Sequence, residues 1–227
     1  MKGRNLWLVI GGVAVAVAVV VVLIIVSASG GSGGKDVKGA DEVLTALKGV
    51  PQSGTRLGAP DAKVVITEFG DLQCPACAQA STELVPEIVD KLVRPGTAAL
   101  EFRPLAFIGP QSVGGALAAA AAAEQGKAWP FVEIAYRNQG AENSGWLSDD
   151  LITSIAKAIP GMDVSAFDTY RQGTDATAAV EAAQREADRV PVSSTPTFVV
   201  TGPGGTKTVV GAVGFDEIQQ AVKAVQG

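Results

Sequence analysis

The chain has 227 residues, with 18 basic and 23 acidic side chains, two cysteines and no histidine. A net charge of −5 argues against nucleic-acid binding, because phosphate contacts need clustered Lys and Arg. The absence of histidine excludes Ser-His-Asp and Cys-His nucleophilic sites and removes the commonest zinc ligand.

An apolar run from Leu6 to Val26 follows two basic residues, Lys2 and Arg4. A helix with ~1.5 Å rise per residue would span about 30 Å here, which matches the hydrocarbon core of a bilayer. The positive-inside rule places residues 1–5 in the cytoplasm and the following chain outside. We therefore expect a single-pass anchor in the cell membrane over residues 6–26, with an extracytoplasmic domain.

A cleaved secretory signal is the alternative interpretation of this run, with Ser27 and Ser29 as small residues near the cleavage point. The apolar core of a signal peptide has ~7–15 residues, so this longer run favours a retained anchor. Both interpretations export the domain to a place where stable disulfide chemistry occurs. Residues 27–54 are predicted as a flexible Gly- and Ser-rich linker, with one short helix over residues 41–48.

The folded domain is expected over residues 55–227. Its first strand covers residues 63–69, where β-branched side chains indicate a strand buried on both faces. A helix then starts at the cysteines and extends to about residue 93, and Pro86 should kink it. A second strand is predicted over residues 98–103.

Helical patterns fill the interval from about 105 to 190. The predicted helices cover residues 116–123, 129–138, 150–159, 163–172 and 175–189. Strands over residues 197–201 and 207–211 form a hairpin, and an amphipathic helix over 215–225 closes the chain. The order of strand, helix, strand, helical insert, hairpin and helix predicts an α/β thioredoxin fold with a helical domain inserted after its second strand.

Cys74 and Cys77 stand where the first strand meets the following helix. Unpaired N–H groups and a partial positive charge at a helix N-terminus stabilise a thiolate, so the pKa of Cys74 should fall below ~8.5. Cys77 lies one turn deeper and can form a disulfide with Cys74, while Pro75 suits a first turn that needs no N–H. This arrangement predicts exchange through a mixed disulfide on Cys74.

A C-x-x-C pair also occurs in metal sites and in structural roles, so an inter-chain metal site and inert cysteines are the alternatives. The position after a buried strand, in an exported chain with no other cysteine, favours redox chemistry. We expect no metal and no cofactor.

Two further elements accompany the cysteines. A buried Glu68 would have a raised pKa and could exchange protons with Cys77. The alternative is a carboxylate at the solvent edge of the strand, and Asp71 is a nearby rival for the same role. A cis bond between Thr195 and Pro196 would turn the Thr195 backbone toward Cys74, where it could pair with an extended substrate. Only ~5% of X-Pro bonds are cis in folded proteins, so a trans proline at a strand edge is the alternative.

The segment Glu68-Phe69-Gly70-Asp71-Leu72-Gln73-Cys74-Pro75-Ala76-Cys77 resembles the active-site segment of DsbA-like thiol-disulfide oxidoreductases. Residues 57–62, 124–129 and 194–198 resemble the family's lead-in to the first strand, a part of its helical insert and its cis-proline loop. The resemblance covers about residues 55–226. It implies catalytic roles for Cys74, Cys77, Glu68 and Pro196, and substrate contacts at Pro75, Ala76 and Thr195.

The resemblance also implies a dithiol oxidase that introduces disulfides into exported cysteine-containing proteins. Its implied partner is a quinone-linked membrane re-oxidant of the DsbB or vitamin K epoxide reductase type. The best-studied oxidases carry His where this chain has Ala76, which supplies no charge. We therefore expect a Cys74 pKa between ~3.5 and ~7, and a potential between ~−120 and ~−270 mV.

Two other functions fit the same fold. A disulfide reductase or isomerase would use the same cysteines, and Thr195 does not distinguish these from an oxidase. Isomerases usually need a dimerisation module, for which residues 35–54 are too short. A redox-silent binding domain is the second alternative, and the intact cysteine pair argues against it.

Overall fold

A mixed sheet forms the centre of the fold, and one of its two central strands, β3 (Val65–Gly70), leads to the two cysteines. The computed structural model describes residues 37–190 and 192–227, within a unit that extends from Lys35 to Gly227. No helix among these residues is long and apolar enough to cross a membrane. The anchor expected over residues 6–26 lies outside the described residues.

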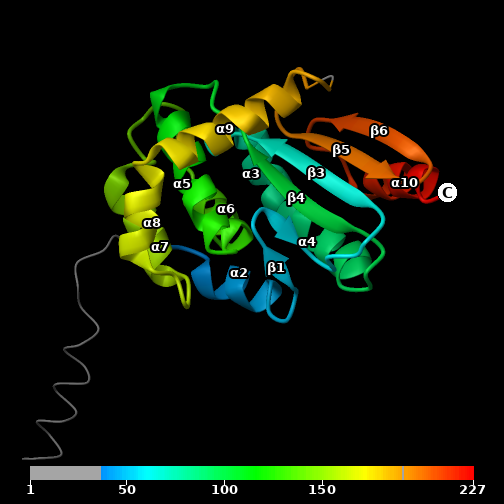
Figure 1. Cartoon of the computed structure of the whole chain (residues 1–227), viewed down its shortest axis with the longest axis horizontal. Coiled ribbons are helices and arrows are strands. Elements are labelled where there is room, and N and C mark those ends of the chain that lie inside the picture. The colour runs from blue at the N-terminus through cyan, green and yellow to red at the C-terminus, as the bar shows by residue number, and fades with distance from the viewer. Residues whose placement is uncertain (1–36, 191) are drawn as a thin grey trace, which may run out of the picture. The chain divides into compact units, whose positions relative to one another are not determined.

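The sheet has six strands in the order β1-β2-β4-β3-β5-β6 (Figure 1). Its other strands are β1 (Gln52–Ser53), β2 (Arg56–Leu57), β4 (Ala99–Pro104), β5 (Thr197–Gly202) and β6 (Gly205–Val210). Strand β3 pairs in parallel with β4 and antiparallel with β5, so it has a hydrogen-bonded neighbour on each side. The residues of β3 after Val65 are all buried, which confirms the prediction that this strand is buried on both faces.

The helices follow the predicted order, with a helical insert between β4 and β5 (Figure 1). After β3 come α3 (Pro75–Glu83), α4 (Val85–Ile88) and a π-helical turn (Val89–Val93). The insert comprises α5 (Pro110–Glu124), α6 (Ala128–Arg137), α7 (Asp149–Ala158), α8 (Val164–Arg171) and α9 (Thr174–Ala187). Helix α10 (Phe215–Val225) packs against the β5–β6 hairpin. The thioredoxin-like α/β fold with its insert is therefore confirmed.

Local chemistry explains the helix boundaries. The Asp163 carboxylate accepts a hydrogen bond from the Ala166 N–H at 3.0 Å, as expected for an N-cap. Ser148 caps α7 in the same way, through the Leu151 N–H. Pro86 lies in the first turn of α4, where its missing N–H costs nothing, so the predicted long helix is divided just before it.

The start of the domain differs from the expected linker boundary at residue 54. Helix α2 (Ala40–Ala46) matches the short helix predicted there, but Val43, Leu47 and Val50 are all buried in the main core. Strands β1 and β2 follow and were not predicted, because two-residue strands carry no periodic pattern. Residues 37–54 therefore belong to the folded unit, since removing these side chains from water stabilises it.

Each face of the sheet packs against helices. Ile66, Phe198 and Val200 belong to the main core with the cysteines of α3. On the opposite face Phe69 and Val199 form a smaller cluster with residues that include Ala187 of α9. This alternation places Glu68, which has Phe102 and Phe198 as register partners, on the face that carries the active-site helix.

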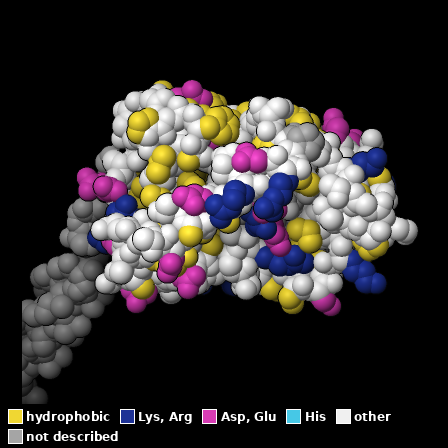
Figure 2. Space-filling model, turned by 45° about the horizontal axis from the view of Figure 1, so that its top comes forward, with side chains coloured by type: hydrophobic (Ala, Val, Ile, Leu, Met, Phe, Trp, Pro, Cys, Tyr) yellow, Lys and Arg dark blue, Asp and Glu magenta, His cyan; other side chains and the backbone are white. Residues whose placement is uncertain are grey.

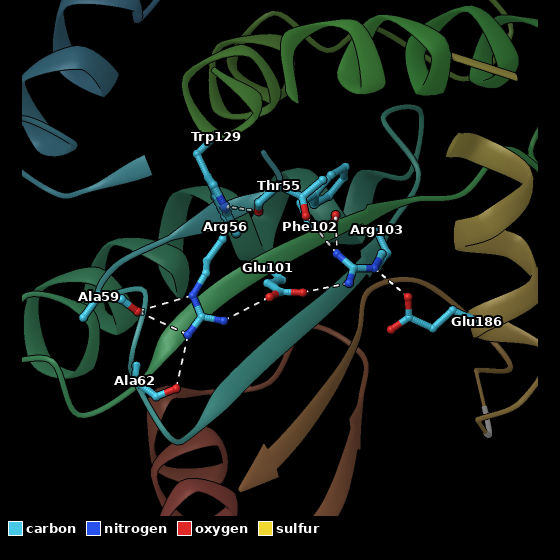
Figure 3. Close-up of polar contacts among 9 residues, drawn as sticks. All are labelled: Thr55, Arg56, Ala59, Ala62, Glu101, Phe102, Arg103, Trp129 and Glu186. Atoms are coloured by element: carbon cyan, nitrogen blue, oxygen red, sulfur yellow. Dashed lines mark hydrogen bonds and ion pairs between the residues drawn. The ribbon is translucent and has the colours of Figure 1, made fainter. Parts of the chain in front are cut away.

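A chain of ion pairs connects β2, β4 and α9 (Figure 3). Glu101 binds Arg56 at 3.0 Å and Arg103 at 2.7 Å, and Arg103 also binds Glu186 at 2.6 Å. Trp129 of the insert donates to the Thr55 carbonyl beside this chain at 2.9 Å. On the face drawn in Figure 2, Lys and Arg side chains likewise lie next to Asp and Glu. That face carries no uniformly basic surface of the kind that nucleic-acid binding needs.

Candidate active site

Cys74 is the residue from which helix α3 begins. It serves as the N-cap in an extended conformation, and Pro75 occupies the first turn. The Cys74 N–H donates to the Asp71 carbonyl at 2.9 Å, which closes the turn between β3 and α3. Both cysteines are free thiols, and Cys74 is 7% exposed whereas Cys77 is fully buried. Cys74 is thus the more accessible sulfur, although it is less open than the sequence predicts.

The two cysteines differ strongly in acidity. The pKa of Cys74 is lowered to about 6, first by a hydrogen bond from the Cys77 thiol, then by a side-chain hydrogen bond from Thr195 and by the Cys77 and Ala76 N–H groups. Burial opposes these effects. The pKa of Cys77 is raised far above its ordinary value by burial, by its hydrogen bond to Cys74 and by the Glu68 charge. At neutral pH Cys74 is therefore a thiolate and Cys77 a thiol, as the sequence interpretation expects.

Thr195 and Pro196 lie at the start of β5, opposite the cysteines. Their peptide bond is cis, and both residues are buried. The Cys74 Sγ lies 3.3 Å from the Thr195 carbonyl oxygen, within the range of a thiol hydrogen bond. The structure thus brings this pair to Cys74, as the sequence interpretation predicts.

Glu68 is 1% exposed, which places it inside the fold and not at the solvent edge of β3. Its pKa is raised well above the ordinary value by burial and by the negative charges of Glu133 and Cys74. Its Oε1 atom has no hydrogen-bond partner. A buried, uncompensated carboxyl beside a buried thiol is suited to holding a proton that the thiol can exchange.

Asp71, the rival of Glu68, has a different environment. Its carboxylate accepts hydrogen bonds from the backbone N–H groups of Gln73 at 2.9 Å, Phe107 at 3.1 Å and Ile108 at 3.2 Å. These contacts join the active-site turn to the segment after β4. Asp71 is therefore a structural group that holds two loops together.

Pro75 is exposed and Ala76 is half-buried, so the turn between the cysteines has an apolar surface open to a polypeptide. Ala76 contributes its backbone N–H to the stabilisation of the Cys74 thiolate but no charge. The surface of this turn is consequently free of charged side chains.

The residues of the insert that form hydrogen bonds with the active-site turn were not predicted from the sequence. Gln139 donates from Nε2 to the carbonyl oxygens of Leu72 at 2.8 Å and Cys74 at 3.0 Å. Gln73 donates to the Ser112 hydroxyl at 3.0 Å and accepts from the Asn143 N–H at 2.7 Å. Polar residues in an insert carry no sequence signal for such contacts, because only the tertiary fold brings them to the turn.

Two residues of helix α6, Tyr136 and Glu133, also lie near the active-site turn. The Tyr136 hydroxyl donates to the Asp71 carbonyl at 3.4 Å, and burial and the nearby Cys77 raise its pKa well above the ordinary value. Glu133 is 4% exposed and lies one turn earlier on the helix. An acidic thiol at a helix start, a buried partner thiol and a buried carboxyl together provide what thiol-disulfide exchange requires.

Comparison with known proteins places the chain among proteins of this chemistry. The model of the thioredoxin family matches residues 52–224. A probable disulfide bond formation protein D from Bacillus cereus is 33% identical over 149 residues, which cover 64% of this chain and 69% of that protein. Disulfide bond formation protein D from Bacillus subtilis is 26% identical over 199 residues, which cover 83% of each chain. The crystal structure of oxidised BdbD from Bacillus subtilis aligns with a TM-score of 0.67 and 23% identity, over 77% of this chain and 95% of that one, and shows the same fold.

Proposed function

The chain belongs to the thioredoxin family, and from this membership we propose that it is an extracytoplasmic thiol-disulfide oxidase, which introduces disulfides into exported proteins. It is a thiol-disulfide oxidoreductase of the DsbA-like kind, and its relatives in two Bacillus species are named for disulfide bond formation. The observation that carries the direction is the similarity to proteins named for disulfide bond formation, and the lowered pKa of Cys74, about 6, agrees with it.

A low pKa on the accessible cysteine favours oxidation of substrates. Each unit by which the pKa falls stabilises the reduced form by up to ~1.4 kcal/mol, which equals ~30 mV for a two-electron couple. A more stable reduced form makes the disulfide a stronger oxidant. Because the Cys77 thiol and Thr195 lower this pKa, the site favours the transfer of electrons from substrate to enzyme.

In this proposal a substrate thiolate attacks Cys74 and displaces Cys77, and a second substrate thiolate then attacks the mixed disulfide and releases Cys74. Glu68 supplies the proton that the departing Cys77 takes up. Thr195 and Pro196 hold the extended substrate beside Cys74, and Pro75 and Ala76 form the apolar surface against which it packs.

A cleft beside the Thr195 segment supports a polypeptide substrate. It has a volume of about 460 Å³, and its lining includes Leu105 and Phe107, which follow β4, and Val192 and Ser194, which precede Thr195. Phe107 is 57% exposed, a large apolar side chain open to solvent beside the site. Gln184 and Asp188 add polar groups to this mostly apolar lining. Such a surface suits an unfolded chain, whose hydrophobic residues are exposed together with its thiols.

The location of the domain follows from the N-terminal sequence. We propose that residues 6–26 anchor the chain in the cell membrane with residues 1–5 in the cytoplasm, because Lys2 and Arg4 precede the apolar run. The Gly- and Ser-rich residues 27–34 would then tether the anchor to the domain. The proposed re-oxidant is a quinone-linked membrane protein of the DsbB or vitamin K epoxide reductase type.

Fractionation of cells tests the anchor. The full chain should sediment with membranes, and its domain should be digested by externally added protease. A soluble form that starts near Gly30 would identify a cleaved signal.

The test of direction is equilibration of the full chain with glutathione, together with oxidation of a reduced, unfolded ribonuclease. We expect the oxidised chain to restore ribonuclease activity and its potential to lie between ~−120 and ~−270 mV. A potential at or below the thioredoxin value of ~−270 mV would contradict the oxidase and favour the reductase alternative.

A further inference from the structure

A proton must move at Cys77 in every turnover, yet Cys77 has no contact with solvent. Cys77 is fully buried, and Glu68 is 1% exposed. Glu68 can exchange a proton with Cys77, but its own proton must still come from water outside the fold. The described structure therefore needs a further group between Glu68 and solvent.

We propose that Glu133 is this group and that it carries protons between Glu68 and a small water-accessible cavity beneath helix α2. The proposal rests on the thiol-disulfide exchange proposed above. Within the described residues, four buried side-chain N or O atoms have no hydrogen-bond partner. Two of them are Glu68 Oε1 and Glu133 Oε1, so each carboxyl keeps one oxygen free to receive a proton.

Glu133 is held close to the active-site helix. Its Oε2 accepts a hydrogen bond at 2.8 Å from Ser81, which lies one turn after Cys77 on α3. Arg137 Nη1 donates to the same carboxylate oxygen at 3.3 Å and to the Ser81 hydroxyl at 3.2 Å. These three residues form a polar cluster between α3 and α6, in which Ser81 and Glu133 are buried and Arg137 is partly exposed. The Glu133 charge acts on Glu68 strongly enough to raise the pKa of Glu68, second only to burial, so the two carboxyls are electrostatic neighbours.

The outlet is a cavity of about 100 Å³ on the outer side of Glu133. Val43 and Ala46 of helix α2 and its C-cap residue Leu47 form part of the apolar lining. Its polar lining consists of Glu133, Arg137, Asp90 and Arg94. A cavity of this size with several polar partners has room for ordered water. Arg94 also donates to the Ala46 and Lys48 carbonyls and so fastens the end of α2 over the cavity.

Glu133 can release and accept protons near neutral pH. Burial raises its pKa to about 7, against the lowering effects of Arg137 and Ser81. The ionisable groups that face this region are Arg137 and Tyr136 on its own helix, Glu68 on β3, the two cysteines on α3, and Asp90 and Arg94 beyond α4. A group with a pKa near the working pH is the most efficient proton carrier.

The proton and electron balance is simple. When a substrate thiolate forms a bond to Cys74, the Cys74–Cys77 bond breaks and its electron pair goes to Cys77. Cys77 takes a proton from Glu68, Glu68 takes one from Glu133, and Glu133 takes one from cavity water. During re-oxidation the proton leaves by the reverse path, and the two electrons pass to the disulfide of the re-oxidant.

The test is the pH dependence of reduction of the oxidised full chain by glutathione, with rate constants expressed per glutathione thiolate. Samples are quenched with acid and their thiols counted by alkylation. In the wild type, we expect the rate constant to fall as the pH rises through about 7, because Glu133 loses its proton. Glu133→Gln should slow the reaction by about 10²-fold at pH 6 and abolish this fall, because an amide carries no transferable proton.

Two further variants separate the relay from a structural role. Ser81→Ala keeps the carboxyl but loses a hydrogen bond that lowers the pKa of Glu133, so the fall should move to higher pH. Glu87→Gln removes an exposed acid on α4 and should behave like the wild type.

If Glu133→Gln keeps the wild-type rate and the fall of the rate constant near pH 7, the relay is wrong. Ribonuclease oxidation by the wild type still decides the oxidase function separately. A second result would also contradict the relay, namely that Ser81→Ala and Glu133→Gln slow the reaction equally while the rate constant still falls near pH 7. In that case the cluster acts only by holding α3 to α6.

Discussion

The Sγ of Cys74 lies 3.3 Å from the carbonyl oxygen of Thr195, a residue 121 positions away in the sequence. The Thr195 side chain also contributes to the lowered pKa of Cys74 through a hydrogen bond. One residue thus offers an acceptor to the thiol and a donor to the thiolate. Because Thr195 is also a proposed substrate contact, we propose that it links the acidity of Cys74 to substrate binding.

The roles of the cysteines predict an asymmetry in trapped intermediates. Cys77→Ser should accumulate mixed disulfides between Cys74 and exported proteins, because the resolving thiol is missing. Cys74→Ser should accumulate none, because Cys77 is fully buried. Non-reducing gels of cells that express each variant measure this directly. Equal trapping by both variants would contradict the assignment of Cys74 as the nucleophile.

The Thr195 hydroxyl should contribute measurably to the acidity of Cys74. Thr195→Val keeps the shape of the side chain but removes the donor, so the pKa of Cys74 should rise from about 6 toward its ordinary value. Thiolate absorbance against pH measures the change. Thr195→Ser retains the hydroxyl and serves as the matched control, with a pKa near that of the wild type. An unchanged pKa in Thr195→Val would show that the hydroxyl does not reach the sulfur.

Ala76→His should make the enzyme a stronger oxidant. In the present structure Ala76 stabilises the thiolate only through its backbone N–H. A protonated imidazole beside Cys74 would add a positive charge and lower the pKa of Cys74. The reduction potential should rise by up to ~30 mV for each unit by which this pKa falls. The reduction potential, measured by equilibration with glutathione, and the pKa of Cys74, measured by thiolate titration, should change together. A lower pKa with an unchanged potential would contradict the link between thiolate stabilisation and oxidising power.

Much of the fold could be predicted from sequence patterns. Strand β3 was evident because its β-branched residues precede the cysteines, and the helices of the insert showed apolar periodicity. Strands β1 and β2 were missed because each has only two residues. The packing of Val43 and Leu47 into the core was missed because a Gly- and Ser-rich segment before them suggested a linker.

The inner part of the site depended on tertiary contacts. Cys74, Cys77 and Pro75 could be recognised from local spacing, and Glu68 from its charge within an apolar strand. Close approach between β3 and α6 depends on Gly70, where an added Cβ would lie 2.8 Å from the Tyr136 hydroxyl. Nothing in the sequence of α6 shows that Glu133, its single carboxylate, lies inside the fold, because a charged side chain on a helix usually faces solvent.

Glu133 should make the stability of the reduced protein depend on pH. Its folded pKa of about 7 lies above the ordinary value of 4.5, because burial disfavours the carboxylate. The folded state therefore binds more protons than the unfolded state between these two pH values, and the free energy of unfolding falls as the pH rises through this window. The contribution is fully present below the ordinary pKa and is lost as the pH passes the folded pKa.

Glu133→Gln should remove that part of the pH dependence, since glutamine does not titrate. Between pH 5 and pH 8 the wild type should lose about 2–3 kcal/mol more stability than the variant. Urea unfolding of the reduced full chain in a non-ionic detergent measures both proteins, and Glu87→Gln controls for the loss of an exposed acid. Glu68 remains in both chains, but the Glu133 charge raises its pKa in the wild type, so the measured difference includes this coupling, which has the same sign. Parallel stability curves for the wild type and Glu133→Gln would contradict a raised pKa at Glu133, because a carboxyl that is ionised in both states adds no slope.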